Sequence, residues 1–240
     1  MLLDEKSPVP LYCQLTEKLR KNIESGEWTP HSLIPSETEL CEKYGVSRGT
    51  VRQALSQLVQ EGLLYRKQGK GTFVAEPKIT QQLNRFYSFA QDMRERGLKP
   101  SSKLLQNEKI LPDSYIKNVL GLKENEMVYK IMRLRLANQE PLILETSYLV
   151  EELFPDLDRE DIEKVPLYDL IIKKYRVKIT RARETFEPIL VDRFEAEKLK
   201  IPIGSPALLV KRITYTTGIP FEFRKSIVRG DKCSYSVELI

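Results

Sequence analysis

The sequence is poor in the residues that build metal sites and disulfide frameworks. Among its 240 residues there are three cysteines and one histidine, and Cys13, Cys41 and Cys233 lie far apart. An odd number of dispersed cysteines, with no C-x-x-C pair, argues against a zinc site and against a disulfide scaffold. We therefore expect no metal, no cofactor, and reduced, mostly buried thiols in a cytoplasmic protein.

The chain also lacks a long apolar run and a strong excess of one charge. No segment is apolar enough over a sufficient length to span a bilayer, and no signal-peptide pattern follows Met1. The formal net charge is only +5, so nucleic-acid binding has to be argued from local patterns. The length suits two domains, each able to bury its own core.

Residues 34–74 carry the pattern of two short helices joined by a tight turn. Ser36 and Glu39 form an S-x-x-E capping box, which predicts a helix start, and Gly45 permits a sharp turn at its end. Ser47 suits the N-cap of a second helix, whose apolar stripe recurs at helical spacing: Val51, Ala54, Leu55, Leu58 and Val59. This pattern predicts a helix-turn-helix, in which the start of the second helix meets base edges of DNA.

A basic hairpin follows the second helix. Gly62 suits the end of that helix, and two strand-like segments, 63–65 and 72–74, flank a loop rich in glycine and lysine. Between residues 47 and 72 there are five cations and one acid: Arg48, Arg52, Arg66, Lys67, Lys70 and Glu61. Glycine amides approach phosphate closely and cations attract it, so the hairpin is typical of a DNA-binding wing.

Two other interpretations of this segment stay open from the residues alone. Helix-turn-helix cores also serve as protein interaction modules, and a K-x-x-K loop is often a solvated tip. The combination of a capped helix, a glycine turn, an arginine-led helix and a basic hairpin favours DNA binding.

Segment 8–75 resembles the winged helix-turn-helix head of the GntR family of bacterial regulators, with the motifs PSExEL, GVSRxTVRxAL, EGLL and GxGTFV in order. The resemblance implies DNA contacts from both helices and from the wing. With Ser47 and Lys67 added from the residue pattern, the expected DNA-binding residues are Ser36, Ser47, Arg48, Thr50, Arg52, Lys67, Gly69, Lys70 and Gly71. Many members have arginine where this chain has Thr38, so one cationic contact is expected to be missing.

The rest of the sequence predicts a second domain of the α+β class. We expect the head at residues 1–76, a linker at 77–82 and the second domain at 83–240. Short turns such as 138–141 and 217–220 join segments of strand character, which favours antiparallel neighbours. The expected strands are 103–111, 127–138, 142–150, 177–188, 207–217 and 221–228, and the expected helices are 88–96, 113–120, 167–175 and 192–200.

Two arginines mark one expected strand of this domain. Val128, Met132 and Leu134 alternate with Arg133 and Arg135, which places both arginines on the other face of the strand. Two guanidiniums one pleat apart can bind a phosphate or carboxylate with paired hydrogen bonds. The alternative is an exposed arginine ladder, paired with acids on neighbouring strands.

Residues 83–239 resemble the UTRA effector domain of the HutC-type branch of that family, which has a chorismate-lyase-like fold. The supporting motifs are SFAQDMRERG, PLILETSY, PLYDLI and PFEFRKSIVRGD. The resemblance implies a small acidic effector, bound by backbone amides at a helix start, by the arginine pair and by two carboxylates. The expected effector-binding residues are Ser88, Phe89, Ala90, Arg133, Arg135, Glu145, Tyr168, Glu222 and Arg224.

Three positions depart from relatives that sense amino-sugar phosphates. Ala90 stands where a hydroxyl residue is frequent, Pro166 where serine is frequent, and Val228 where tyrosine is frequent. Each change removes a polar contact to the expected ligand. Arg224 either compensates in part or faces outward from its strand.

Three functions are compared on this basis. The favoured one is a homodimeric repressor that binds a short palindromic operator in double-stranded DNA and responds to a small acid such as a phosphorylated sugar or amino sugar. In the second, the distal domain only dimerises, or it senses an organic or amino-acid-derived acid. The third, an enzyme, is disfavoured because no catalytic constellation is evident, and we expect no catalytic residues.

Overall fold

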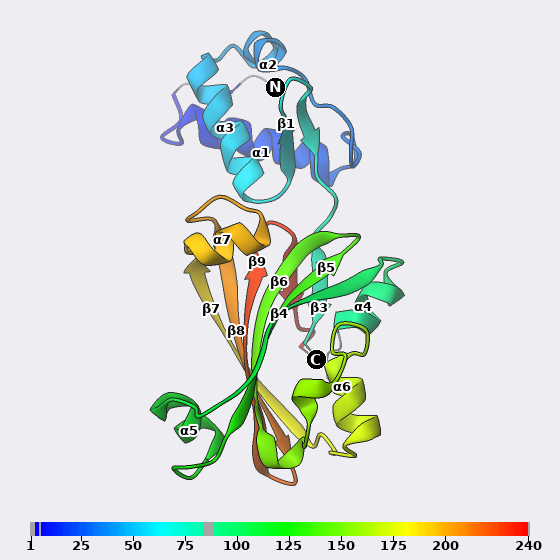
Figure 1. Ribbon diagram of the computed structural model, residues 1–240. Coiled ribbons are helices and arrows are strands. Elements are labelled where there is room, and N and C mark those ends of the chain that lie inside the picture. Colours follow the sequence, from blue (N-terminus) through cyan, green and yellow to red (C-terminus); the bar gives the residue numbers. More distant parts are fainter. Residues whose placement is uncertain (1–2, 5, 84–88, 240) are drawn as a thin grey trace. The chain divides into compact units, whose positions relative to one another are not determined.

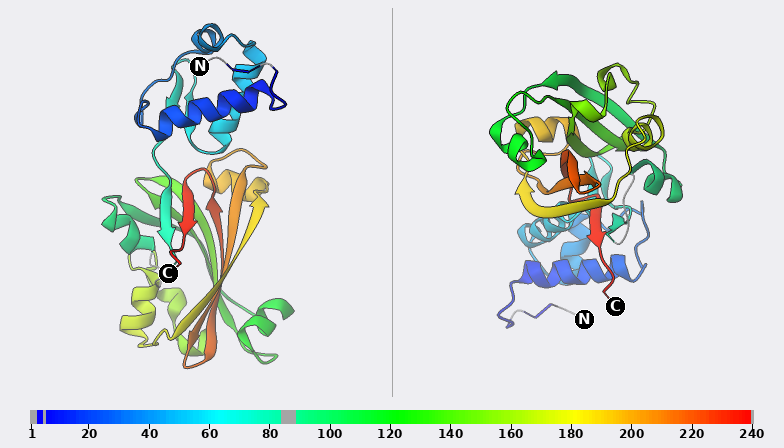
Figure 2. Two further views of the ribbon diagram at one scale, coloured as in Figure 1. Left: turned by 180° about the vertical axis from the view of Figure 1, so that it is seen from behind. Right: turned by 90° about the horizontal axis from the view of Figure 1, so that it is seen from below.

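The computed structural model describes residues 3–4, 6–83 and 89–239, and the chain divides into two compact units (Figure 1). The first, here called the head unit, is Met1–Thr80 together with Gly230–Ser234. The second, the sheet unit, is Gln81–Arg229 together with Tyr235–Ile240. Part of the expected linker is regular: Ile79–Gln82 form strand β3, which pairs with β10 (Cys233–Ser236), as Figure 2 shows.

The head unit is a helix-turn-helix followed by a two-stranded wing. Its elements are α1 (Leu11–Glu24), α2 (Glu37–Tyr44), α3 (Arg48–Gln60), β1 (Leu64–Lys67) and β2 (Gly71–Val74). The strands pair antiparallel, and the apolar stripe of α3 packs on α1 and α2 around buried Leu15, Leu19 and Leu40. The expected winged helix-turn-helix is confirmed.

The helix boundaries follow from the capping residues. The Ser36 side chain accepts a hydrogen bond from the amide of Glu39, whose carboxylate in turn accepts one from the Ser36 amide at 2.7 Å. Gly45 ends α2 with φ 68°, and the Ser47 hydroxyl accepts the amide hydrogen bond of Thr50 at the start of α3. These side chains satisfy amides that a helix start leaves without partners.

Replacement of Ser36 by alanine is expected to lower the free energy of unfolding of the head unit by about 1 kcal/mol, because the capping box is lost. The chain contains one tryptophan, Trp28, which packs against the head core. Urea unfolding followed by its fluorescence therefore measures this unit. Thr38→Ala, on the same helix but outside the capping box, is the control, and an equal loss in both variants would contradict the capping argument.

The sheet unit is built on one twisted antiparallel sheet of six strands, in the order β4-β5-β6-β9-β8-β7 (Figure 1). The strands are β4 (Pro100–Ile110), β5 (Val128–Ala137), β6 (Glu140–Val150), β7 (Arg181–Leu190), β8 (Pro206–Thr216) and β9 (Ile219–Arg229). The helices are α4 (Phe89–Glu95), α5 (Ser114–Leu120), α6 (Leu167–Asp169) and α7 (Arg193–Leu199). The expected α+β class with an antiparallel sheet is confirmed.

The two faces of the sheet are covered differently. On one face, α5 packs in an apolar cluster that includes Phe223, and α7 packs in another that includes Leu134. On the other face α6, the short helical turns Glu151–Leu153 and Leu157–Arg159, and the π-helical segment Leu170–Lys174 cover an apolar cluster. The expected helix 167–175 is thus a short α-helix that widens into a π-helix.

Other expectations differ in detail. Strand β7 begins at Arg181, four residues later than expected, and β4 begins at Pro100, three residues earlier. The cysteines are free, but each is half-buried and not buried as expected. Among the described residues, no helix has the length and apolarity needed to cross a membrane, and no group of three or more His, Cys, Asp or Glu is arranged for a metal ion.

Candidate functional site

The start of α3 presents polar and cationic side chains to solvent. Arg48 is exposed. The hydroxyl groups of Ser47 and Thr50 are hydrogen-bonded at 3.0 Å, which orients both side chains at the helix start. Arg52 is exposed as well, and its Nε donates to Glu37 of α2 at 2.8 Å. Two arginines one helical turn apart thus flank the capped end, with one of them oriented by α2.

The wing brings glycines and cations together at its tip. Gly69 and Gly71 have φ values of 70° and 111°, and the Lys70 amide donates to the Lys67 carbonyl at 2.9 Å, which closes the turn. The Lys67 ammonium lies 5.4 Å from the ring centre of Tyr65 and 5.2 Å from that of Phe73. These rings hold the Lys67 side chain along the wing.

A hollow lies between the start of α2 and the wing. Its lining includes Ser36, Glu37, and the wing residues from Arg66 to Thr72. The α2 start and the wing glycines therefore border one concave surface within the head unit. Helix amides, glycine amides and lysines are the groups that bind backbone phosphates in protein–DNA complexes.

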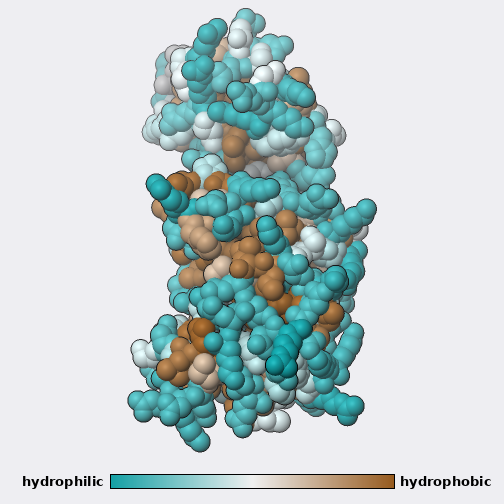
Figure 3. All heavy atoms as spheres, in the orientation of Figure 1, coloured by the Kyte–Doolittle hydropathy of each residue, from teal (hydrophilic) through white to brown (hydrophobic). Residues whose placement is uncertain are grey.

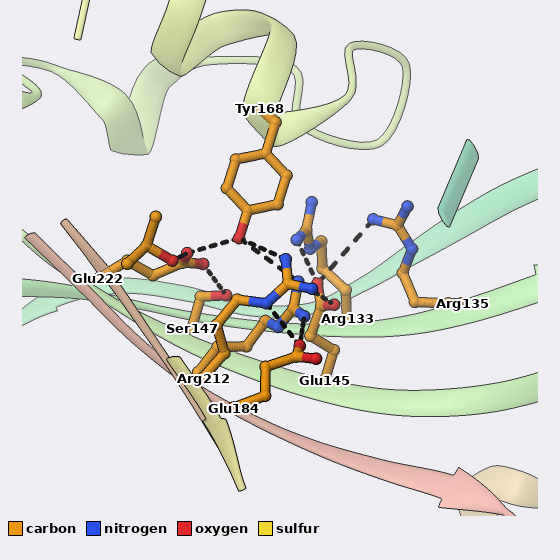
Figure 4. A network of polar contacts seen from close by, with 10 residues as sticks. Arg133, Arg135, Glu145, Ser147, Tyr168, Glu184, Arg212 and Glu222 are labelled. Carbon is orange, nitrogen blue, oxygen red and sulfur yellow. Dashed lines mark hydrogen bonds and ion pairs between the residues drawn. The ribbon is translucent and has the colours of Figure 1, made fainter. Parts of the chain in front are cut away.

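A cluster of polar and charged side chains is buried on one face of the sheet (Figure 4). In register across the strands, Arg133 of β5 lies opposite Glu145 of β6, which lies opposite Ser226 of β9. The next row joins Ser147, Arg224, Arg212 and Glu184 from β6, β9, β8 and β7. We call these residues, with Arg135, Tyr168, Thr214 and Glu222, the arginine cluster.

Glu145 is surrounded by three guanidiniums. Arg133 donates to its Oε1, Arg135 Nη1 lies 4.0 Å from the same oxygen, and Arg224 Nη1 lies 3.4 Å from Oε2. Burial alone would raise the pKa of Glu145, but Arg133, Arg224 and Arg135 outweigh it and hold the pKa well below its usual range. Glu145 is therefore a carboxylate at neutral pH.

Glu222 is held by hydroxyl groups. It accepts hydrogen bonds from Ser147 at 3.0 Å, from Tyr168 at 2.6 Å and from Thr214 at 2.8 Å. Burial, followed by the charge of Glu222, raises the pKa of Tyr168, so this phenol keeps its proton and donates. Arg212 and Arg224 donate to the Tyr168 oxygen at 3.4 and 3.5 Å.

The structure places the expected effector-binding residues as follows. Arg133 and Arg135 are only 2% and 7% exposed, so the exposed-ladder alternative is wrong, although their pairing with an acid is found. Arg224 is buried and turned toward Glu145, which excludes the outward orientation. Ser88 lies outside the described residues. Phe89 is buried at the start of α4, with the Arg135 guanidinium 4.8 Å from its ring centre.

The three departing positions lie near this cluster. Ala90 and Pro166 line a small hollow together with Arg135 and Arg94. Val228 is buried on β9, two residues beyond Ser226 and on the same face of the strand. None of the three side chains at these positions can donate or accept a hydrogen bond.

Sequence reasoning missed five members of the arginine cluster: Ser147, Glu184, Arg212, Thr214 and Ser226. Each lies at an alternate position of its strand, so the period of two could have assigned its face. Their mutual contacts depend on the strand order and register, which pair residues far apart in the chain.

Comparisons with known proteins identify the families of both parts of the chain. Residues 11–74 match the model of the gntR family of bacterial regulatory proteins, and residues 95–234 match the UTRA domain. The chain is 41% identical to the HTH-type transcriptional repressor NagR of Bacillus subtilis, over 98% of this chain and 97% of the relative. It is 30% identical to a histidine utilization repressor of Pseudomonas putida, over 95% and 91%.

Solved structures support the same assignment. The crystal structure of PhnF from Mycobacterium smegmatis superimposes with a TM-score of 0.67 at 27% identity, covering 94% of this chain and 98% of PhnF. The family and its members are transcriptional regulators and not enzymes. The chain belongs to the gntR family of bacterial regulatory proteins, in its HutC-type branch, and is a DNA-binding transcriptional regulator with a UTRA domain.

Proposed function

We propose that this protein is a homodimeric repressor whose affinity for a palindromic operator is controlled by a small acidic metabolite, with phosphorylated sugars and amino sugars as the first candidates. The observation that carries the proposal is the buried arginine cluster, where four guanidiniums accompany three carboxylates. A positive excess in a buried site is costly unless an anion neutralises it.

The repressor assignment draws on the head unit and on the relatives. The hollow between α2 and the wing suits the backbone of a duplex, and its lining residue Glu37 is bonded to Arg52 of α3. Arg48, exposed at the start of α3, suits the major groove. Both named relatives are repressors, and the name of the second refers to histidine utilization. The effector class is therefore inferred from the chemistry of the pocket of this chain.

The homodimer is supported by the open part of the sheet. Between α5 and α7 the sheet face carries half-buried apolar side chains, among them Leu105, Met132 and Ile227. Figure 3 shows apolar surface over this part of the sheet unit. A second copy on that face would cover it and would supply the second head that a two-fold operator requires. Light scattering during size-exclusion chromatography is expected to give twice the mass of the chain, and a monomer would contradict this part of the proposal.

The experiment that tests the effector is thermal unfolding against a panel of sugar phosphates, amino-sugar phosphates, organic acids and amino-acid-derived acids. A ligand present at about 100 times its dissociation constant adds about 2.7 kcal/mol of stability, which shifts the transition clearly. A hit is then titrated into the protein–DNA complex, and loss of the complex is the expected response of a repressor.

Arg133→Met provides the matching variant, because methionine keeps much of the side-chain length and removes the charge. We expect it to bind DNA like the unaltered protein and to lose the thermal shift with the hit. Arg193→Met is the control, because it removes an exposed arginine from α7, which packs on the opposite face of the sheet, and it is expected to keep the thermal shift. A complete panel without any shift would favour the second candidate function, a distal domain that only dimerises.

A further inference from the structure

Gly49 is the second residue of α3 and is exposed. Glycine is one of the least favourable residues inside a helix, so its presence there needs an explanation. The backbone of Gly49 is helical, without the positive φ of Gly62. A Cβ at Gly49 would meet only the Ser47 hydroxyl, at 3.6 Å, which is an ordinary van der Waals distance. Neither the backbone nor the packing of the described residues therefore requires glycine at this position.

Gly49 lies on the face of α3 that is turned away from the head core. The buried side chains of α3 form one stripe: Val51, Ala54, Leu55 and Leu58. With about 100° between successive residues of a helix, Gly49 lies almost opposite the middle of this stripe. Gln53, four residues later, shares this outer face and is exposed as well.

The outer face leaves Gln53 open space over the start of α3. Long side chains of a helix point back toward its N-terminus, so the side chain at position 53 covers the turn that contains Gly49. Ser56, the next residue of this face, accepts a hydrogen bond from Arg66 of the wing at 3.2 Å. The carboxamide of Gln53 has no such partner within the part of the chain that the structure describes.

We propose that Gln53 recognises an adenine in the major groove through the space that Gly49 leaves free, and that this pair of residues sets the base preference at one position of each half-site. A glutamine carboxamide carries a donor and an acceptor side by side, which match N7 and N6 of adenine. Arg48 and Arg52 suit guanine and phosphate instead. The proposal goes beyond the proposed function, because it needs only that the head binds duplex DNA and is independent of any effector.

The test begins with selection of duplexes from a random library by the unaltered full chain and by Gln53→Ala. We expect the unaltered protein to bind about tenfold more weakly when the recognised adenine is replaced, and Gln53→Ala to be indifferent at that position alone. Gln60→Ala is the matched control. It removes the same side chain from the exposed end of α3, about 10 Å farther along the helix, and is expected to select the same duplexes as the unaltered protein.

Gln53→Glu tests the same contact through a change of preference. A carboxylate only accepts hydrogen bonds, and it pairs with the N4 donor of cytosine. We therefore expect this variant to select cytosine where the unaltered protein selects adenine. A new preference at one position cannot arise from partial unfolding.

Gly49→Leu tests the open space. Leucine favours a helix more than glycine does, so we expect a higher midpoint of urea unfolding, followed by Trp28 fluorescence. The same side chain fills the space in front of Gln53, so we expect about tenfold weaker binding to the selected duplex and little further loss when the adenine is replaced.

Two outcomes would overturn the proposal. In the first, Gln53→Ala keeps every base preference of the unaltered protein, which would leave the operator of the proposed function intact but remove Gln53 from its recognition. In the second, Gln53→Ala weakens all duplexes equally, which would make Gln53 a phosphate contact. An undiminished preference for adenine in Gly49→Leu would overturn the role of Gly49.

Discussion

Replacement of Gly62 by alanine is expected to lower the free energy of unfolding of the head unit by about 4 kcal/mol, from backbone strain and overpacking together. Gly62 follows α3 with φ 77°, a conformation that residues with a side chain rarely adopt. A Cβ at this position would lie 2.0 Å from the carbonyl oxygen of Asp231 and 2.7 Å from its carbonyl carbon. Because both atoms belong to backbone, no side-chain rotation can relieve the contact.

Gly26 is a close control for this variant. Its φ of 78° matches that of Gly62, but a Cβ there meets nothing within 4 Å. Gly26→Ala is therefore expected to cost only about 1 kcal/mol, the strain of the backbone alone. Urea unfolding followed by Trp28 fluorescence compares the two. Similar losses would contradict a close approach of segment 230–234 to the end of α3.

Replacement of Arg48 by alanine is expected to weaken binding to the specific operator by about 100-fold, as for the loss of a bidentate arginine–base contact. Arg48 is the first residue of α3 and is exposed, at the end of the helix that enters the major groove in this fold. The measurement is fluorescence anisotropy with a duplex selected by the unaltered protein from a random library.

Two further variants distinguish base-specific contacts from the sequence-independent electrostatic attraction of the protein to DNA. Lys21→Ala removes an equal charge from the last turn of α1 and is expected to change affinity little. Lys70→Ala at the wing tip is expected to weaken all duplexes similarly and to reduce the salt dependence of binding. If Arg48→Ala also weakened specific and random duplexes equally, Arg48 would be a phosphate contact and not a reader of bases.

Much of the head could be predicted from sequence because its determinants are local. The capping box joins Ser36 to a residue three positions away, and Gly45 supplies the turn between α2 and α3 within a few residues. The wing follows directly from two short strands around glycines. The departure at Thr38 is equally visible in the sequence, since it depends on one position in a contiguous motif.

The sheet unit could be predicted only in part. Alternation in β5 placed Arg133 and Arg135 on one face, and their burial there agrees with that pattern. The helix at 167–175 was located, but its widening into a π-helix was not, because periodicity does not distinguish the two over one turn. The pairing of β3 with β10 joins segments about 150 residues apart, and no local signal specifies it.

The sequence by itself determined the class of protein, the winged helix-turn-helix and the arginine pair, because capping, turns and alternation act over a few residues. Only the tertiary structure decided what surrounds that pair. Arg224, Arg212 and Glu184 meet because β9, β8 and β7 lie side by side in one register. The same strand order brings Arg224 to Glu145 and leaves the positive excess on one buried face. Strand order and register are set by packing over the whole sheet, so the charge of the site is a property of the fold.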